Sequence, residues 1–169
     1  YKLKDLEALP DDSIHLGFVE GSCRTNEDLH LLKTMRKKSK LLIAWGSCSC
    51  YGGVQGLGNQ WPIEELVERK FLQADSVTDP RIPESNMPGF LGIVKPNPAH
   101  VKFEMVLPGC PPTSDNTYDV VEALLTGKPF DLPERTVCDE CPKEREDKHI
   151  VKFYRTHEGK IDPNKCLLD

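Results

Sequence analysis

Near its beginning, the sequence places one segment of helical periodicity between two short apolar runs. The first run covers residues 14–20 and the second covers residues 40–45. Between them, Leu29, Leu32 and Met35 recur at the spacing of an amphipathic helix. A strand, a helix and a second strand within about 30 residues form a βαβ unit, in which the two strands are parallel. The predicted fold class is therefore α/β.

Local signals mark the ends of the expected helix and the nature of the second strand. Thr25 is a residue type that caps helix N-termini, and Asp28 follows at the spacing of a capping box. Basic residues at 36–38 suit the negative end of the helix dipole. Residues 40–45 lack polar alternation, which indicates a strand covered on both faces of its sheet.

The middle of the chain is expected to be less regular. A helix is predicted over residues 62–71, with Pro62 at its first position. Residues 73–100 contain five prolines and little periodicity, and we interpret them as an extended surface loop. Residues 101–107 are the next candidate strand.

Beyond that strand, the pattern predicts one more helix and then a change of character. Thr113 or Ser114 is expected to cap this helix, and Gly127 to end it. Charged residues, proline and cysteine then replace the periodic pattern. We therefore predict an α/β domain over residues 1–130 and the start of an irregular, cysteine-bearing segment over residues 131–169.

Charge and hydropathy argue against two classes of partner. Lys and Arg number 22 against 27 Asp and Glu, a net charge of −5, so there is no basic bias toward nucleic acid. No apolar run reaches the roughly 18 residues of a membrane-spanning helix, so no membrane span is expected. The abrupt start at Tyr1 and the end shortly after Cys166 lead us to expect the middle part of a longer subunit.

The seven cysteines are an odd number, which argues against a framework of disulfides. Such thiols more often serve metals or redox chemistry in a reducing compartment. Cys48 and Cys110 follow successive predicted strands, in loops rich in Gly and Pro. Because the carboxyl ends of parallel strands share one edge of a sheet, the two thiols can meet in a metal site. The alternative is a pair of buried cysteines that pack as small apolar residues.

Cys50 stands two residues after Cys48. The two could form a redox-active or metal-binding pair, although C-x-x-C is the commoner spacing for disulfide exchange. The loop is expected to be extended, and only one of the two side chains is expected to face a site shared with Cys110. Cys48 directly follows Gly46 and Ser47 at the end of the strand. We therefore expect Cys48 to face the site and Cys50 to pack as a small apolar residue.

Cys138, Cys141 and Cys166 form a second group of cysteines in the sequence. The C-x-x-C of Cys138 and Cys141 would place two thiolates on one metal ion or cluster face. A zinc site is one alternative, because His157 and the three thiols would make a Cys₃His set, and His149 also lies between them. The other is an iron–sulfur cluster that takes one more ligand. The spacing alone does not separate the two.

Taken in order, these motifs are similar to those of a known family. Residues 19–22 read Val-Glu-Gly-Ser, residues 46–48 Gly-Ser-Cys, residues 52–53 Gly-Gly and residues 108–112 Pro-Gly-Cys-Pro-Pro. The series resembles the small subunit of NiFe hydrogenases and the related 20-kilodalton-type subunit of respiratory complex I. The cysteine-bearing tail resembles the gamma subunit of methyl-viologen-reducing hydrogenases, which partner with heterodisulfide reductase in methanogens.

The resemblance implies a flavodoxin-like domain that holds a proximal 4Fe-4S cluster beside the nickel–iron site of a separate large subunit. Carried over by position, Cys48 and Cys110 are two proximal ligands. In the same way, Cys138, Cys141 and Cys166 belong to a downstream cluster region. The family supplies the other two proximal ligands from a C-x-x-C on its first βα loop, and it has further cysteines downstream. This chain contains no counterpart of either set.

The function implied by the resemblance is electron relay in a cytoplasmic NiFe hydrogenase. Electrons from H₂ oxidation would pass through 4Fe-4S clusters to a partner such as heterodisulfide reductase, with a small 2Fe-2S-type delta subunit in the complex. No catalytic residue is expected on this chain. Two alternatives remain open. One is the iron–sulfur subunit of a complex-I-like or sulfhydrogenase-type enzyme, and the other is a non-redox α/β module with a structural zinc.

Overall fold

The computed structural model describes residues 3–83, 85–132, 134, 138–139, 141–144, 162 and 164–166. Contacts between Cα atoms divide the chain into two compact units, Tyr1–Phe130 and Asp131–Asp169. In the described part of the chain, no helix is both long enough and apolar enough to cross a membrane.

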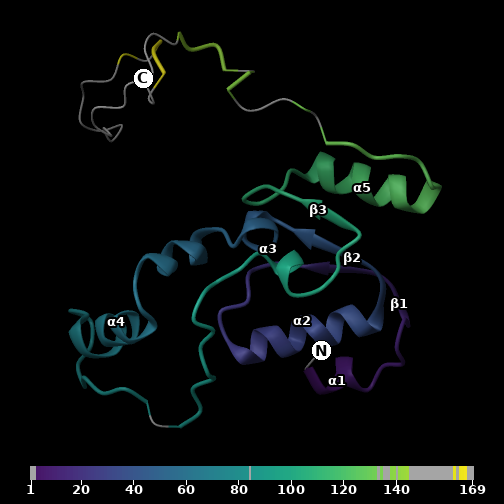
Figure 1. The fold of residues 1–169 in the computed structure, drawn as a ribbon. Helices are drawn as coiled ribbons and strands as arrows, with labels where there is room; N and C mark the ends of the chain where they lie inside the picture. Colours follow the sequence, from purple (N-terminus) through teal and green to yellow (C-terminus); the bar gives the residue numbers. More distant parts are fainter. Residues whose placement is uncertain are drawn as a thin grey trace. The chain divides into compact units, whose positions relative to one another are not determined.

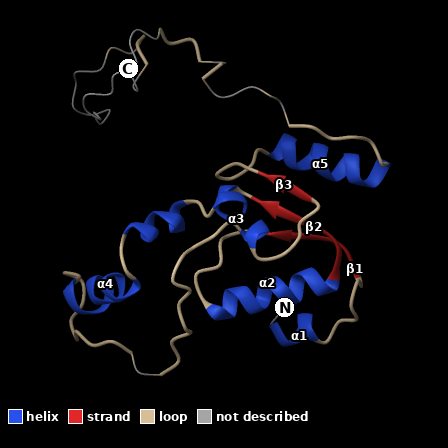
Figure 2. Cartoon of the chain, in the orientation of Figure 1, coloured by secondary structure: helices blue, strands red, loops and turns tan. Residues whose placement is uncertain are grey.

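The first unit is built on a sheet of three parallel strands. These are β1 (Ile14–Val19), β2 (Ser39–Trp45) and β3 (Met105–Leu107), in the order β1-β2-β3. Figures 1 and 2 show the strands side by side, with the short helix α3 at their carboxyl ends. The α/β class and the parallel sheet are therefore confirmed. The flavodoxin-like topology stays a prediction.

Helix α2 (Asn26–Lys38) connects β1 to β2 and begins at the expected capping box. The Thr25 hydroxyl accepts a hydrogen bond from the Asp28 N–H at 3.2 Å, and the Asp28 carboxylate accepts one from the Thr25 N–H at 2.8 Å. The helix packs against the sheet where Gly17 has no side chain. A β-carbon there would lie 2.6 Å from Ser39 Oγ and 3.1 Å from Met35 Cε. Glycine at this position therefore permits the close approach of helix and strand.

The core lies around the central strand. Leu42, Ile43 and Ala44 of β2 are fully buried, as expected of a strand covered on both faces. Helix α5 (Ser114–Thr126) contributes the buried Val120. Its N-cap is Thr113, whose hydroxyl accepts a hydrogen bond from the Asn116 N–H at 3.2 Å. Its C-cap is Gly127, in the left-handed conformation that glycine tolerates, so both predicted helix ends are confirmed.

Strand β3 is shorter than the predicted strand over residues 101–107. The Glu104 N–H donates to the Leu42 carbonyl at 3.0 Å, but the Leu42 N–H donates to the Glu104 carboxylate at 2.8 Å. Arg36 of α2 donates to the same carboxylate oxygen, also at 2.8 Å. A side chain thus takes the place of a main-chain acceptor at this point. The regular ladder begins only at Met105.

Several short helices lie outside the βαβ unit. Helix α1 (Leu3–Glu7) was not predicted. The predicted helix over residues 62–71 is divided into α4 (Ile63–Glu68) and a turn of π-helix, η2 (Arg69–Gln73). Pro62 is the N-cap of α4, one position before the predicted one.

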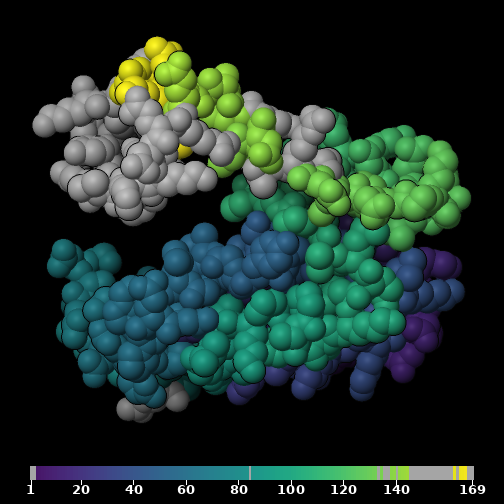
Figure 3. All heavy atoms as spheres, turned by 45° about the horizontal axis from the view of Figure 1, so that its top comes forward, coloured from purple at the N-terminus to yellow at the C-terminus, as the bar shows by residue number. Residues whose placement is uncertain are grey.

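Within its described residues, the expected loop before β3 contains a short 3₁₀ helix, η3 (Asn97–Ala99). Another 3₁₀ helix, η1 (Val54–Gln60), follows α3. Asn59 of η1 joins the two segments, because its side-chain amide donates to the Val94 carbonyl and accepts from the Val94 N–H, both at 2.9 Å. Figure 3 shows the segment before β3 (teal) lying beside the segment after α3 (blue).

Candidate functional site

The loops that carry Cys48 and Cys110 are hydrogen-bonded to each other at the carboxyl edge of the sheet. The Gly46 N–H donates to the Leu107 carbonyl at 2.8 Å, and the Ser47 N–H donates to the Gly109 carbonyl at 2.7 Å. The Gly109 N–H donates in turn to Ser47 Oγ at 3.2 Å. The expectation that parallel strands bring these two loops together is confirmed. Whether the two thiols bind a metal stays a prediction.

The segment after β2 is helical, so the expectation of an extended loop there was wrong. Residues Ser47–Tyr51 form one turn of α-helix, α3. The turn begins at Gly46, with φ of 85°, and ends at Gly52, which is in the left-handed conformation. Positive φ values at both ends favour glycine, because it lacks the β-carbon that would clash there. A compact helical turn therefore replaces the extended path.

Cys48 and Cys110 both reach the surface. Cys48 is half-buried and Cys110 is exposed. Gly53 packs directly on the first thiol, since a β-carbon on Gly53 would lie 2.5 Å from Cys48 Sγ. A β-carbon on Gly109 would clash with the backbone of Pro112, and the Cys110–Pro111 peptide bond is cis. Glycines thus let the backbone pack closely around both thiols, and prolines restrict the backbone beside Cys110.

Two further cysteines near this edge are buried. The Cys50 thiol donates to the Ala44 carbonyl at 3.3 Å, and the side chain is buried. The expectation that Cys50 packs as a small residue is confirmed, and the helical backbone accounts for it, because residues two apart in an α-helix point to nearly opposite sides. Burial raises the pKa of the Cys50 thiol, against the opposing effect of a hydrogen bond from the Leu107 backbone. Burial, together with the charge of Asp28, raises the pKa of the Cys23 thiol to about 11.

A third loop, after β1, meets α3 through a residue that the sequence analysis did not single out. Asn97 is buried, and its side chain donates to the Gly21 carbonyl at 2.9 Å and to Ser49 Oγ at 3.0 Å. The Cys23 N–H donates to Asn97 Oδ1 at 3.3 Å. No local signal identified Asn97, because it stands in a proline-rich loop 48 residues from Ser49.

The tail cysteines Cys138, Cys141 and Cys166 lie in the second unit, and all three are among the residues that the structure describes. The Cys141 N–H donates to the Cys138 carbonyl at 3.4 Å, which closes the C-x-x-C turn. The Cys166 N–H donates to the Glu144 carbonyl at 2.9 Å, which places Cys166 beside the segment that follows the C-x-x-C. His149 and His157 lie outside the described residues. Among the residues that the structure describes, no three Cys, His, Asp or Glu side chains gather as a metal site.

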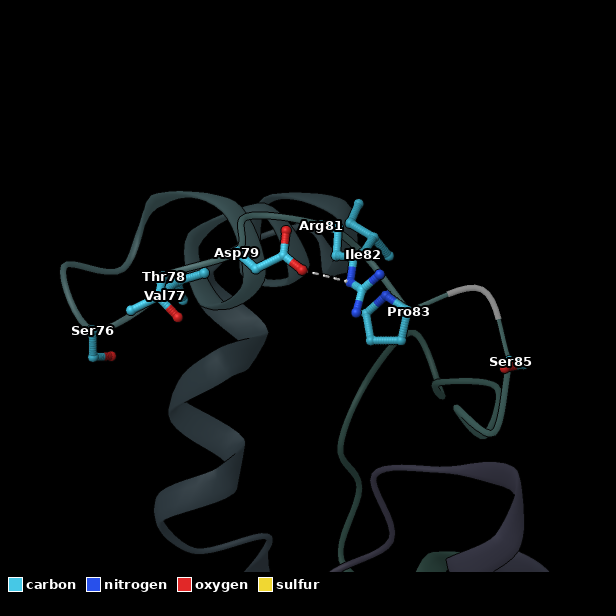
Figure 4. Close-up of a pocket in the computed structure, with 8 residues that line it drawn as sticks. All are labelled: Ser76, Val77, Thr78, Asp79, Arg81, Ile82, Pro83 and Ser85. Carbon is cyan, nitrogen blue, oxygen red and sulfur yellow. Dashed lines mark ion pairs between the residues drawn. The ribbon is translucent and has the colours of Figure 1, made fainter.

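One loop of the described surface forms a hollow that contains none of these thiols. It has a volume of about 790 Å³, and Figure 4 shows its lining. Asp79 and Arg81 form an ion pair there at 3.1 Å, with both side chains largely exposed. An exposed ion pair on a single loop offers no enclosed chemistry. We therefore place the candidate site at the cysteine loops. The residues that line the hollow are Ser76, Val77, Thr78, Asp79, Arg81, Ile82, Pro83 and Ser85.

Residues 3–124, which include both cysteine loops, match the model of the family described as NADH ubiquinone oxidoreductase, 20 Kd subunit. The chain belongs to this family. It is 40% identical over 167 residues to the G subunit of the vhu F420-non-reducing hydrogenase of Methanocaldococcus jannaschii, an alignment that covers 99% of this chain and 58% of that protein. The recognition of the hydrogenase small-subunit family is confirmed.

Other relatives of this family member are also hydrogenase subunits. The iron-sulfur G subunit of the F420-non-reducing hydrogenase of Archaeoglobus profundus is 36% identical, over 99% of this chain and 59% of that protein. The delta subunit of the NAD-reducing hydrogenase HoxS of Cupriavidus necator is 31% identical, over 78% and 64% respectively. The chain therefore spans about 60% of the length of these relatives.

A solved structure supports the α/β fold of this family member. It is described as the crystal structure of NAD+-reducing [NiFe]-hydrogenase in the H2-reduced state. The similarity has a TM-score of 0.67 and 28% sequence identity, and it covers 71% of this chain and 68% of that one.

Proposed function

We propose that this chain is the electron-transfer subunit of a NiFe hydrogenase, in which Cys48 and Cys110 are two ligands of a proximal 4Fe-4S cluster. The observation that carries the proposal is the direct hydrogen bonding between the two cysteine loops, Ser47 N–H to the Gly109 carbonyl at 2.7 Å. It occurs in a chain whose relatives are hydrogenase subunits. No substrate chemistry is assigned to this chain, because the nickel–iron site belongs to another subunit.

The residues at this edge can supply two of the four thiolate ligands that a 4Fe-4S cluster takes. Cys48 and Cys110 are accessible thiols on adjacent loops, whereas Cys23 and Cys50 are buried. Gly53 leaves the Cys48 sulfur without a neighbouring side chain at the point of closest approach. When bound, the cluster would accept and release one electron at a time. The protein sets its properties through thiolate ligation, hydrogen bonding and burial.

The two remaining cluster ligands would not come from the cysteine loops described above. In the family they stand on a C-x-x-C after a strand of the same sheet. In the described part of the chain, β1 pairs only with β2, so its other edge is open for such a strand. The carboxyl end of β1 also lies at the edge where the Cys48 loop begins, since the strands are parallel. Ligands from that side would complete the set.

Exposed apolar side chains that follow Cys48 in the chain favour an interface with a large partner subunit. Three large apolar side chains are exposed directly after it along the chain: Tyr51 at 64%, Val54 at 67% and Leu57 at 59%. Exposed apolar side chains that gather in one region often mark a protein interface. We propose that the large subunit with the nickel–iron site covers this face, so that electrons reach the proximal cluster over a short distance.

The tail would carry the electrons onward. Cys138, Cys141 and Cys166 are proposed as ligands in a downstream cluster region. The proposed acceptor is heterodisulfide reductase, reached through a small 2Fe-2S-type delta subunit. These partners, and a cytoplasmic location, follow from the resemblance to the gamma subunit of methyl-viologen-reducing hydrogenases.

The test is an anaerobic purification of the complete complex, as wild type and as Cys110→Ala. We expect iron and acid-labile sulfide in the wild type, and a low-temperature EPR signal of the reduced proximal cluster. The signal should be lost or remodelled in Cys110→Ala, with the complex still assembled. A wild-type complex with zinc and no acid-labile sulfide would instead support the non-redox α/β module.

A second measurement tests the division of roles between subunits. The chain expressed by itself should show no hydrogen-dependent reduction of a viologen dye, because the nickel–iron site is expected on the large subunit. The complete complex, in which the remaining cluster ligands are present, should reduce the dye under the same conditions. Activity of the isolated chain would contradict the assignment.

A further inference from the structure

We infer that Asn97 is a positioning residue for the Cys48 turn, holding it against the loop after β1 through the hydroxyl of Ser49. The inference rests on the proposed function, since it concerns the direction in which Cys48 presents its thiolate. It assigns a role to a residue outside both cysteine loops.

The side chain of Asn97 uses all of its polar atoms between two loops. Its Nδ2 donates to the Gly21 carbonyl at 2.9 Å and to Ser49 Oγ at 3.0 Å, while Oδ1 accepts from the Cys23 N–H at 3.3 Å. Asn97 is 1% exposed and Ser49 is fully buried. Water therefore cannot replace these bonds without rearrangement, and losing them would leave buried polar groups unpaired.

The Cys48 turn depends on such an outside contact. Helix α3 has only five residues, and its N-cap, Gly46, provides no side-chain hydrogen bond. A single helical turn is not stable alone, because nucleation fixes several residues for few hydrogen bonds. The Ser49 hydroxyl, adjacent in the chain to Cys48, is therefore a natural point at which to anchor the turn.

Asn97 itself is held in place by contacts other than the Ser49 bond. The segment before it is fastened by the two hydrogen bonds between Asn59 and Val94. Val94 is buried and lies 3.6 Å from the position of a β-carbon on Gly52, at the end of α3. The segment should thus remain on the protein when the Asn97 amide is removed. This allows the orienting role of Asn97 to be separated from a general loss of structure.

Hydrogen-bonding partners just outside a metal site orient its ligands, and their loss typically lowers metal affinity or activity about 10- to 100-fold. In Asn97→Ala, Cys48 would keep its thiol but lose the anchor that sets its direction. We expect the altered geometry to appear in the spectrum of the proximal cluster and in its reduction potential. A purely structural contribution would lower stability and leave both unchanged.

The experiment uses the complete complex as wild type, Asn97→Ala, Ser49→Ala and the matched control Asn59→Ala. The control removes two hydrogen bonds to the same segment but contacts no residue of α3 through them. EPR of the reduced proximal cluster, its midpoint potential, and iron loss to a chelator are measured for each. Hydrogen exchange of the α3 amides is followed in parallel.

We expect Asn97→Ala to shift the signal and the potential, to accelerate iron loss roughly tenfold, and to speed exchange at α3. Ser49→Ala should change each quantity in the same direction by a smaller amount. If the Asn97→Ala complex does not assemble, the result for Ser49→Ala tests the positioning role by itself. Asn59→Ala should lower thermal stability with the signal unchanged. Equal shifts in the Asn59 and Asn97 variants, or an unchanged signal in Ser49→Ala, would overturn the inference.

The failure of this inference is distinguishable from that of the proposed function. If the wild-type complex has a proximal signal that Cys48→Ala removes, the proposed function stands, and a neutral Asn97→Ala then overturns the positioning role alone. If the wild type has no cluster that depends on Cys48, both are overturned.

Discussion

The sulfur of Cys48 lies against Gly53, where a β-carbon would stand 2.5 Å from Sγ and 2.7 Å from the Cys48 Cα. Gly53 also has φ of 52° and ψ of −145°, a conformation that side chains strongly disfavour. Any side chain at this position would thus both strain the backbone and clash with the proposed ligand. This contact explains the glycine at position 53, and the left-handed conformation at the end of α3 explains Gly52.

Gly53→Ala should therefore destabilise the protein by about 2–4 kcal/mol, since strain and overpacking each cost roughly 1–3 kcal/mol. It should also displace Cys48 and alter the proximal EPR signal. Thermal denaturation and EPR measure the two effects. Gly56→Ala is the matched control, because a β-carbon there meets nothing within 4 Å. A Gly53→Ala protein as stable as Gly56→Ala would contradict the contact.

Cys48 and Cys50 should respond differently to substitution. Cys48→Ala is expected to abolish or remodel the proximal cluster in the complete subunit. Cys50→Ala should leave it nearly intact, because the Cys50 thiol is buried and bonded to the Ala44 carbonyl. Low-temperature EPR of the reduced complex compares the two. Loss of the signal in Cys50→Ala, with retention in Cys48→Ala, would reverse the ligand assignment.

Glu104 should make the stability of the α/β unit depend on pH. Burial raises its pKa, but hydrogen bonds from Arg36 and the Leu42 N–H and the charges of Arg36 and Lys102 outweigh burial, so the pKa is lowered from 4.5. The stabilisation is fully present above pH 4.5, the value in the unfolded chain, and is lost as pH falls through the lowered folded value.

Glu104→Gln should lower the free energy of unfolding by about 1–2 kcal/mol near neutral pH, as both partners are only about a quarter exposed. The difference from wild type should shrink below pH 4. Urea denaturation at several pH values measures it. The control is Glu65→Gln, which removes an exposed pair with Arg69 worth at most about 0.5 kcal/mol. A pH-independent difference would exclude the carboxylate as its source.

The tail cysteines are expected to bind iron–sulfur and not zinc. The prediction follows from the family resemblance around Cys138, Cys141 and Cys166, against the zinc-compatible spacing. In the anaerobically purified complex, the triple replacement of these cysteines by Ala should lower iron and acid-labile sulfide together, while the proximal EPR signal persists. If the wild-type complex contains stoichiometric zinc that is lost in the triple variant, the tail cysteines bind zinc and the prediction is wrong.

The sequence by itself determined the elements whose signals are local. The capping box of Thr25 and Asp28 and the apolar run of β2 depend on residues a few positions apart, so both were predictable. Parallel strands impose a common carboxyl edge, and for this reason the meeting of the Cys48 and Cys110 loops also followed from the sequence.

Only the tertiary structure decided how that edge is arranged. The helical turn at Ser47–Tyr51 is too short to stand on local propensity, and its form depends on contacts with distant segments. The burial of Cys50 is set by the Ala44 carbonyl, and the role of Asn97 by partners 48 and 76 residues away. Such contacts arise when the chain closes long loops around a common core. Neither composition nor periodicity encodes which polar atoms then meet.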